Sequence, residues 1–422
     1  MRILLGDGSG LTSRQVAGRL AALGHHVGVL SSDPAGLTRF TRATSSWHRA
    51  PPFGDDPLAW LDAAIDVFTA HRYDVLLPTQ EHVTVLAALP SRLRAAGVTT
   101  IAPSFDALLA VQDKVVAHRT LERLGVAHPP AAIALDADQL REWREFPVYA
   151  KAPIGTATSG VHHVTSAEQL AALADAGSFA EAFESGGVLL QTPVSGPLAM
   201  LQAVFDRGRL VAFHANLRVR EGARGGASHK QGIDLPAARA LVVMLGSALG
   251  WHGALSADVV LGDAGPVIID INPRLVEPVN AARCGVDLVG ALLELTRGNR
   301  VAEQPPGTGA ARTHQLLLAV LGAASQGRGR RGVAAELFGG VTHRGSYRDS
   351  REELTPVRGD LRAGLPLLIT AASTLVAPGT WRWFASGGVA NYALTPAAWR
   401  TICRVAESGD PRPPMGYSRD RF

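Results

Sequence analysis

The stretch SADVVLGDAGPVIIDINPRL, residues 256–275, decides the fold of this chain. Two apolar runs flank a Gly-Asp pair, which predicts a β-hairpin with that pair at its tip. Side chains two residues apart share one face of a strand, so Asp270 and Asn272 point the same way. Asp258 lies on the partner strand and faces them, and Arg274 extends along the same face. Two carboxylates and an amide oxygen suit Mg²⁺, which prefers hard oxygen ligands.

Asp270 also interrupts the apolar run VIIDI. A buried carboxylate without a partner is costly, so this position needs a cation or a hydrogen-bond donor. The alternative interpretation is a capped turn at Asn-Pro-Arg that binds nothing.

Lysine is rare in this chain, because only Lys114, Lys151 and Lys230 of its 41 basic residues are lysine. A high-GC genome explains the arginine excess, and a lysine retained under that pressure indicates a place where guanidinium does not fit. Lys114 lies early on a predicted helix, and Lys151 ends an apolar strand before the glycine-rich loop Gly155–Gly160. Ammonium groups beside such a loop are how proteins hold polyphosphate. The alternative is two surface lysines and an ordinary hairpin.

Two further segments carry weaker signals. The apolar strand GVLLQ runs into Gln191, Thr192 and Val194, and such a strand end can present backbone groups to a planar heterocycle. In LRVREGARGGAS, Arg218 and Arg220 share a predicted strand face and can fork onto a carboxylate. Arg224 and the other charges of that loop are equally compatible with a solvated surface.

The first hundred residues alternate between strands and helices, which predicts a doubly wound α/β unit. The expected strands are RILLGD, HHVGVLSSD, YDVLLPT and VTTIAPS. Gly6, Gly8 and Gly10 do not complete the dinucleotide fingerprint, because position 13 is serine; a tight structural turn is favoured over an NAD site.

Further along, the pattern predicts helix from Asp106 to about Asp138 and a helix over Leu235–Leu249. RGGASHKQGID is expected to be a polar loop. After Gly298 we expect the helix HQLLLAVLGAA, a solvated loop at the RGRR cluster (residues 328–331), and then turns and short strands.

Composition limits the class of protein. With 422 residues, 46% hydrophobic and 18% charged, the chain is expected to form two to four domains with ample core, which excludes global disorder. No run of eighteen apolar residues exists, so no membrane span is expected. The net charge of +4 does not indicate a nucleic-acid partner. The start MRILLGDGSG lacks a secretory pattern and two cysteines make a disulfide framework improbable, so a cytoplasmic location is expected.

In this order, the pieces resemble the ATP-grasp superfamily, above all its amino-acid ligase and carbamoyl-phosphate-synthase-like members. The resemblance spans roughly Gln112 to Gly298, and IDINPR (Ile269–Arg274), followed by GVDL, is its most specific element. It implies a Rossmann-like domain over residues 1–105 and an ATP-grasp domain over 106–300, whose two α+β subdomains clamp ATP. Residues 301–422 would complete the core or form a lid.

The resemblance also implies roles for individual residues. The residues implied at the ATP phosphates are Lys114, Lys151 and the loop residues Gly155, Thr156, Ser159 and Gly160. Those implied at the adenine are Gln191, Thr192 and Val194. The implied ligands of Mg²⁺, with two ions expected, are Asp258, Asp270 and Asn272. Arg274 and Lys151 are implied to act on the transferred phosphate. Substrate contacts are implied, more weakly, for Arg218, Arg220, Ser228 and Glu277.

The sequence departs from the superfamily pattern at two places. The magnesium carboxylates are usually glutamates, and here both are aspartates, one methylene shorter. The linker that holds the base often carries an acidic residue, where this chain has Gln191.

The expected activity is an ATP-dependent carboxylate–amine ligase that forms an amide through an acyl phosphate, with small-molecule substrates, at least one of them an amino acid, and no nucleic-acid or membrane partner. A place in peptide-like secondary metabolism and a homodimer are left open. The alternatives are a bicarbonate-using carboxylase or carbamoyl-phosphate-type enzyme and a non-catalytic nucleotide-binding regulator. Against the first, the chain shows no biotin-carrier segment and no second copy of the motifs.

Overall fold

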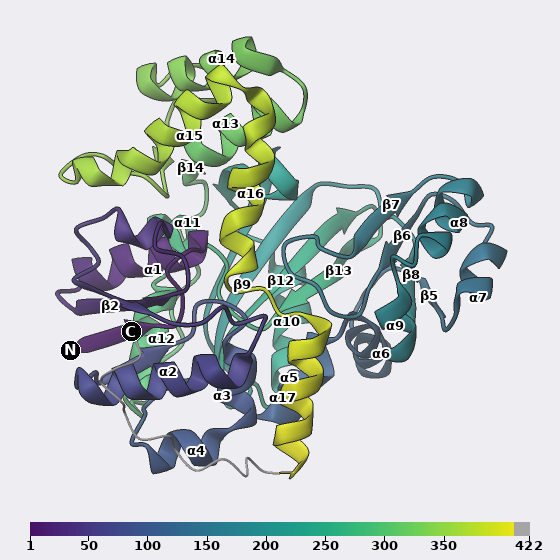
Figure 1. Cartoon of the computed structure of the whole chain (residues 1–422), viewed down its shortest axis with the longest axis horizontal. Helices are drawn as coiled ribbons and strands as arrows, with labels where there is room; N and C mark the ends of the chain where they lie inside the picture. Colours follow the sequence, from purple (N-terminus) through teal and green to yellow (C-terminus); the bar gives the residue numbers. More distant parts are fainter. Residues whose placement is uncertain (409–422) are drawn as a thin grey trace.

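The computed structural model describes residues 1–408 (Figure 1). Its N-terminal part is a parallel four-stranded sheet in the order β3-β2-β1-β4. The strands are β1 (Arg2–Leu5), β2 (His26–Ser31), β3 (Ser46–Arg49) and β4 (Val75–Leu77), and the helices are α1 (Leu11–Ala22), α2 (Pro57–Ala70), α3 (Val83–Ala88) and α4 (Pro90–Ala95). This confirms the expected doubly wound α/β unit.

Two details of this sheet differ from the expectation. VTTIAPS contributes only an isolated bridge between Thr100 and Leu76. The unexpected strand β3 is polar and pairs with β2 alone, at the edge of the sheet. An edge strand needs little apolar surface, so its sequence lacks the usual signal.

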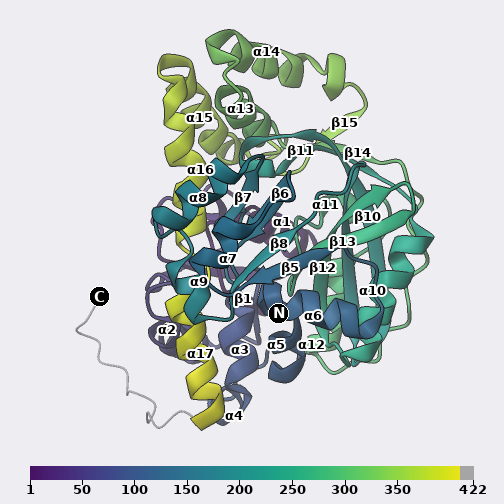
Figure 2. The ribbon, with the colours of Figure 1, turned by 90° about the vertical axis from the view of Figure 1, so that its right-hand side faces the viewer.

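An antiparallel four-stranded sheet follows, in the order β5-β8-β6-β7, and it faces the viewer in Figure 2. Its strands are β5 (Ala131–Ala134), β6 (Val148–Lys151), β7 (Val161–Val164) and β8 (Val188–Gln191). Helices α5 (Phe105–Gln112) and α6 (Lys114–Leu124) lead into it, and α7 (Ala137–Glu142), α8 (Ala167–Asp175) and α9 (Ala180–Glu184) accompany it. This sheet has a hydrophobic core of its own, which includes Leu140, Leu170 and Phe179.

The prediction of continuous helix to about Asp138 was wrong. Helix α6 ends at Gly125, which adopts a left-handed conformation with φ 66°. Pro129 and Pro130 then exclude helical hydrogen bonding, and the chain extends into β5.

The largest sheet has seven strands in the order β13-β12-β9-β10-β11-β14-β15. The strands are β9 (Leu198–Asp206), β10 (Arg209–Glu221), β11 (Ala227–Gly232), β12 (Gly253–Gly262), β13 (Gly265–Asn272), β14 (Arg312–His314) and β15 (Ser350–Glu352), and the helices are α10 (Pro236–Ala248), α11 (Val279–Arg283) and α12 (Leu288–Thr296). The hairpin predicted from residues 256–275 is β12–β13. Strand β11 occupies the segment expected to be a polar loop, because its buried polar side chains find partners inside the protein.

The C-terminal part is mostly helical, which corrects the prediction of turns and short strands there. Its helices are α13 (Leu316–Ser325), α14 (Gly329–Thr342), α15 (Leu365–Val376), α16 (Trp381–Ala390) and α17 (Pro396–Ser408). The RGRR cluster begins α14 instead of forming a solvated loop. Helices α13, α14 and α15 form a layer at the top of Figure 1, and α16 descends from it toward α17, which contacts α2 and α3.

The N-terminal sheet and the seven-stranded sheet share a hydrophobic core. Ile3 and Leu5 of β1 lie in one cluster with Val204 of β9 and Leu292 of α12, so the N-terminal sheet packs against the seven-stranded one. Cys284 is buried and lies at the C-terminal end of α11. Within residues 1–408, no helix is both long and apolar enough to cross a bilayer.

Candidate functional site

The β12–β13 hairpin places the predicted carboxylates opposite one another. Asp258 pairs with Asp270 and Ser256 with Asn272, and a register shift follows Asp258. Burial, and then the neighbouring Asp270, raise the pKa of Asp258 to about 7, against the opposing charges of Lys151, Arg218 and Arg274. Among residues 1–408, neither carboxylate accepts a hydrogen bond or forms an ion pair. Two adjacent buried carboxylates without donors are stabilised by a bound cation or by a shared proton.

This donor set fits magnesium better than a metal held by protein alone. The described residues contain no group of three or more His, Cys, Asp or Glu side chains arranged around a common metal position. Two carboxylates and the Asn272 amide suit Mg²⁺, which is bound in proteins by few carboxylates and completes its shell with water and substrate phosphates.

Lys151 approaches the carboxylates from the other sheet. It is the last residue of β6 and is 6% exposed, and its Nζ donates to the carbonyl of Ile269, next to Asp270, at 2.9 Å. Burial lowers the pKa of Lys151, while Asp270 and Asp258 counteract this effect and Lys114 reinforces it. The ammonium therefore lies between the two sheets, within electrostatic range of Asp258 and Asp270.

Lys114 is the first residue of α6. Asp113 caps this helix by accepting hydrogen bonds from the N–H groups of Val115 and Val116. The Nζ of Lys114 donates to the carbonyl of Gly155 at 3.2 Å, which ties the helix start to the glycine-rich loop. The two lysines singled out by the sequence thus meet at one site.

The loop Gly155–Gly160 contains two consecutive non-glycine residues with positive φ. Ala157 and Thr158 adopt φ values of 52° and 65°, which non-glycine residues rarely do. Within the described part of the chain, the N–H groups of residues 155–158 donate no hydrogen bond. Consecutive free N–H groups in such a turn bind phosphate oxygens, so this loop fits the polyphosphate of a nucleotide.

Arg274 extends from the hairpin toward the N-terminal part and meets Glu81, which the sequence analysis missed. Its Nε donates to Glu81 Oε1 at 3.2 Å, and the hydroxyl of Thr156 lies 3.5 Å from the same oxygen. Glu81 follows the buried strand β4. The available signal was the polar run PTQEH at the carboxyl end of a parallel strand, where ligands commonly bind.

The expected base-binding residues form the linker between the four-stranded and the seven-stranded sheet. Gln191 ends β8 and is buried, and the N–H of Thr192 donates to the carbonyl of Pro130 at 2.9 Å. Val194 lies beside Gly262, the last residue of β12. Its Cγ1 is 3.1 Å from the position that a Cβ at Gly262 would occupy. A contact of these residues with adenine remains a prediction.

Not all of the four predicted substrate-binding residues lie near Asp258 and Asp270. Arg218 donates to the carbonyl of Gly225 at 2.8 Å and forms an ion pair with Glu221 at 3.3 Å, and its charge lowers the pKa of Asp258. Arg220 instead forms an ion pair with Glu336 of α14, because β10 is bulged between the two arginines. The expected fork of both guanidiniums onto one carboxylate is therefore wrong. Ser228 is buried and donates to the carbonyls of Arg220 and Glu221, at 3.1 and 3.3 Å.

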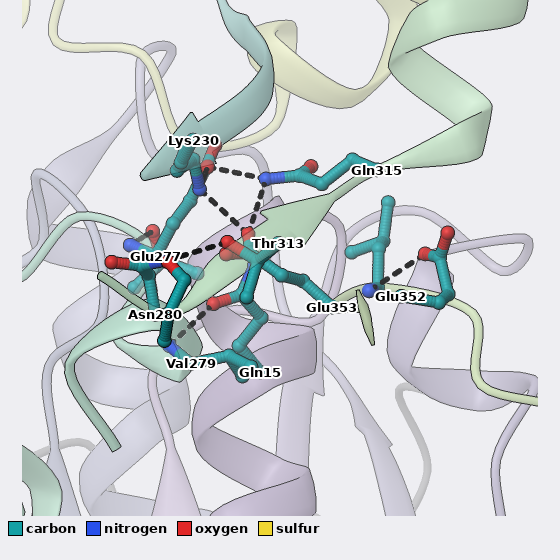
Figure 3. Close-up of polar contacts among 12 residues, drawn as sticks. Gln15, Lys230, Glu277, Val279, Asn280, Thr313, Gln315, Glu352 and Glu353 are labelled. Atoms are coloured by element: carbon teal, nitrogen blue, oxygen red, sulfur yellow. Dashed lines mark hydrogen bonds and ion pairs between the residues drawn. The ribbon is translucent and has the colours of Figure 1, made fainter. Parts of the chain in front are cut away.

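Glu277 belongs to a buried network around the third lysine (Figure 3). Lys230 of β11 forms ion pairs with Glu277 and with Glu353, the latter at 2.6 Å. The amide of Gln315 donates to both carboxylates. Burial alone would lower the pKa of Lys230, but the two glutamates outweigh burial and raise it. The sequence marked Lys230 only by its rarity, and Glu353 not at all.

Known proteins resemble this chain in fold and not in sequence. No protein-family model matches the chain, and no curated protein resembles it in sequence. Among solved structures, the biotin carboxylase domain of Hydrogenobacter thermophilus 2-oxoglutarate carboxylase, a dimer in complex with MgADP, ADP and bicarbonate, superposes with a TM-score of 0.60 at 18% identity, over 74% of each chain.

Two ligase-type structures superpose similarly. The L-amino acid ligase from Bacillus licheniformis gives a TM-score of 0.56 at 15% identity, covering 71% of this chain and 75% of the ligase. N5-carboxyaminoimidazole synthetase from Staphylococcus aureus gives 0.56 at 14% identity, covering 75% and 82%. At these identities, the similarities show a shared fold.

Proposed function

We propose that this chain, which has the ATP-grasp fold, is an ATP-dependent carboxylate–amine ligase that forms an amide bond and releases ADP and phosphate. The observation that carries the proposal is the convergence of Lys114, Lys151, Asp258, Asp270 and Arg274 at one place between the two antiparallel sheets. Cationic groups beside a carboxylate pair and a phosphate-binding loop are the parts that phosphoryl transfer requires.

The roles follow from the positions of these groups. The N–H groups of residues 155–158 and the ammonium groups of Lys114 and Lys151 would hold the phosphate oxygens. Asp258, Asp270 and Asn272 would hold Mg²⁺, which when bound neutralises charge on the β- and γ-phosphates. Backbone groups at Gln191, Thr192 and Val194 would hold the base.

The reaction requires two bond exchanges. An oxygen of the substrate carboxylate attacks the γ-phosphorus, the bond to the β-phosphate oxygen breaks, and ADP leaves. The nitrogen of the amine then attacks the carbonyl carbon of the acyl phosphate, loses a proton, and inorganic phosphate leaves with its electron pair. Arg274 and Lys151 stabilise the charge on the phosphoryl oxygens during the first exchange.

The glycine-rich loop protects the acyl phosphate. Thr156 of this loop lies 3.5 Å from Glu81 Oε1 and so bridges the loop to the N-terminal part. A loop seated there separates the reacting atoms from bulk water, which would otherwise hydrolyse the acyl phosphate.

A second candidate is a bicarbonate-using enzyme. It is favoured by the structural similarity to the biotin carboxylase domain that was solved in complex with bicarbonate and MgADP. The phosphate and magnesium groups would serve both reactions, so the two candidates differ only in the acid that is phosphorylated and the group that attacks it.

The test is ADP release from ATP and Mg²⁺ with the twenty L-amino acids offered singly and in pairs, and separately with bicarbonate. The ligase account predicts release that depends on a particular pair, with the dipeptide found by mass spectrometry. Release that needs only bicarbonate supports the second candidate. ATP binding without release under any of these conditions indicates a nucleotide-binding regulator and contradicts both enzymes.

A further inference from the structure

The segment from Trp381 to Thr395, here called the C-terminal strap, crosses from the helical layer to the N-terminal part (Figure 1). Trp381, Phe384 and Ala385 pack onto the cluster that contains Ala223 and Leu317. The carbonyl of Ala385 also accepts a hydrogen bond from Arg224 at 3.2 Å. The strap is thus attached to the loop that follows Arg218 and Arg220.

The far end of the strap is attached to the N-terminal part. Asn391 accepts hydrogen bonds from the Ser32 hydroxyl at 2.7 Å and from the Phe53 N–H at 3.3 Å. The hydroxyl of Thr395 donates to the carbonyl of Gly54 at 2.8 Å. These contacts fix the short stretch between Asn391 and Thr395 over the carboxyl ends of the parallel strands.

This stretch reaches the reacting groups. The N–H of Leu394 donates to the hydroxyl of Thr156 at 3.3 Å. Thr156 in turn lies beside Glu81, which pairs with Arg274. A continuous set of contacts therefore connects the strap, the phosphate-binding loop and the arginine placed at the transferred phosphate.

Tyr392 is the strap residue with an unused polar group. Its side chain is 8% exposed, and its hydroxyl forms no hydrogen bond with any of the residues 1–408. Burial raises the pKa of this phenol; Arg274 opposes the rise, and Asp7, Glu81 and Glu277 add to it. The hydroxyl therefore remains protonated and can both donate and accept a hydrogen bond.

The carboxylates around Tyr392 differ in what they already bind. Asp7 accepts hydrogen bonds from Ser9, Gly10 and Ser13, and Glu277 is bound by Lys230 and Gln315. Glu81 is 4% exposed, and its Oε2 is buried without a partner. A buried carboxylate oxygen without a donor indicates a place that a bound donor fills.

The free oxygen of Glu81 defines the chemistry of that donor. Arg274 pairs with Oε1 of Glu81, and Oε2 has no partner within residues 1–408. An amino group supplies a donor to this oxygen, whereas a second carboxylate supplies only acceptors.

We propose that the hydroxyl of Tyr392 and Oε2 of Glu81 bind the amino group of the amine substrate, and that the C-terminal strap forms that wall of the site. The inference rests on the proposed ligase function and assigns its amine subsite. Tyr392 is then a residue that contacts substrate, supplied by a part of the chain to which the sequence assigned no chemistry.

The test separates the two substrates with probes that carry one functional group each. L-Amino acid amides have a free amino group and no carboxylate, and N-acetyl-L-amino acids have the reverse. Both series are titrated calorimetrically into the full chain loaded with Mg²⁺ and the β,γ-imido analogue of ATP. Tyr392→Phe and Glu81→Gln are compared with Tyr149→Phe, a matched control at an exposed phenol on β6.

We expect at least one amide to bind the wild-type chain and to bind Tyr392→Phe about tenfold or more weakly, the effect of losing one hydrogen bond to a polar ligand group. The N-acetyl series, the ATP analogue and Tyr149→Phe should show no change. Equal amide affinity in Tyr392→Phe, a loss confined to the N-acetyl series, or no amide binding to the wild type would overturn the inference. Amide binding in this titration, together with no ADP release from ATP with any pair of amino acids, would contradict the ligase function alone.

Discussion

Lys151 has its ammonium placed between the carboxylates of one sheet and the glycine-rich loop of the other. We expect Lys151→Ala to lower the rate of ADP release by about 100-fold or more, since a positioned cation at a phosphoryl group contributes on that scale. Lys151→Arg should not restore it, because the planar fork does not fit this 6% exposed position.

The measurement is kcat for ADP release, with circular dichroism to confirm folding. Arg141→Ala, which removes an exposed cation of the same sheet region, is the matched control and should retain full activity. A Lys151→Ala enzyme with wild-type kcat would exclude the proposed phosphate contact.

Asp270 is predicted to hold Mg²⁺ with Asp258. Asp270→Asn keeps the shape and removes one charge, so the Mg²⁺ concentration for half-maximal activity should rise about tenfold or more. Asp263→Asn, at the exposed tip of the same hairpin, should leave it unchanged. A magnesium titration of ADP release distinguishes the two, and identical curves would rule out the metal role.

The residues of the hairpin could be placed from the sequence because a short turn sets their register. Asp258 and Asp270 lie twelve positions apart, and the alternation of the strands puts both on one face. Glu81 and Tyr392 could not be placed, since their meeting with Arg274 depends on the packing of parts separated by hundreds of residues. No local pattern encodes such contacts.

The glycine-rich loop is a close-packed turn. A Cβ on Gly155 would lie 2.2 Å from the carbonyl oxygen of Ser159, so Gly155→Ala must open the loop and turn its N–H groups away from the phosphates. We expect the KM for ATP to rise about tenfold or more, with little loss of stability.

Gly177→Ala is the matched control for this loop. Gly177 has a positive φ of 66°, which Gly155 does not, and nothing lies within 4 Å of its added Cβ, so Gly177→Ala strains the backbone of a turn outside the proposed nucleotide site. An equal effect of both changes on the KM for ATP would show that Gly155 acts through general strain.

The packing of α3 on α2 depends on the neutral form of His82. Its ring contacts both Trp60 and Phe53, with centroid distances of 4.3 and 4.6 Å, and burial lowers its pKa to about 3. The unfolded chain takes up this proton near pH 6.5 and the folded chain does not. Stability is therefore complete above pH 6.5 and falls as the pH drops toward 3.

In the wild type, uptake of one proton by His82 on unfolding lowers the free energy of unfolding by about 1.4 kcal/mol for each pH unit between about pH 6 and 4. We expect His82→Phe to remove this contribution to the slope. His82 Nδ1 has no hydrogen-bond partner to lose. Urea unfolding at several pH values measures the slope, and His163→Phe, at an exposed histidine, should leave it unchanged. An unaltered slope in His82→Phe would refute the assignment.

Elements with apolar periodicity were predictable, and those stabilised by polar contacts were not. Helices α10 and α13 and the strands of the hairpin follow their patterns closely. Strand β11 reads as a loop because Ser228, His229 and Lys230 are polar, yet all three are buried with partners. A buried ion pair carries no signal in a hydrophobicity pattern.

The Lys230 network joins the three parts of the molecule. Glu277 follows the hairpin, Glu353 follows β15 in the C-terminal part, and Gln15 of α1 donates to Glu353 at 3.3 Å (Figure 3). Lys230→Met would leave two buried carboxylates without their cation. We expect the free energy of unfolding to fall by about 3–5 kcal/mol.

Chemical denaturation measures this loss. The triple variant Lys230→Met, Glu277→Gln, Glu353→Gln also removes both carboxylates, so it should recover most of the stability. Recovery in the triple variant identifies uncompensated charge as the cause, whereas an equal loss in both variants would point to lost packing instead.

At the scale of the whole molecule, the α/β class and the ATP-grasp fold could be predicted from the order of a few motifs. The helical C-terminal layer and the strap could not, because they are held by contacts with residues near the start of the chain. We propose that the chain has three domains, residues 1–105, 106–300 and 301–422. The third domain would then contribute to the site as well as to the core.

The central claim is that the γ-phosphoryl group of ATP passes to a substrate carboxylate. The most direct measurement uses an acid labelled with ¹⁸O in its carboxylate and analyses the released phosphate by mass spectrometry. Attack by that carboxylate places one of its oxygens in the phosphate, so we predict one ¹⁸O in each phosphate molecule formed during amide synthesis. Phosphate without ¹⁸O, or AMP in place of ADP, would contradict the acyl-phosphate mechanism and the function proposed for this chain.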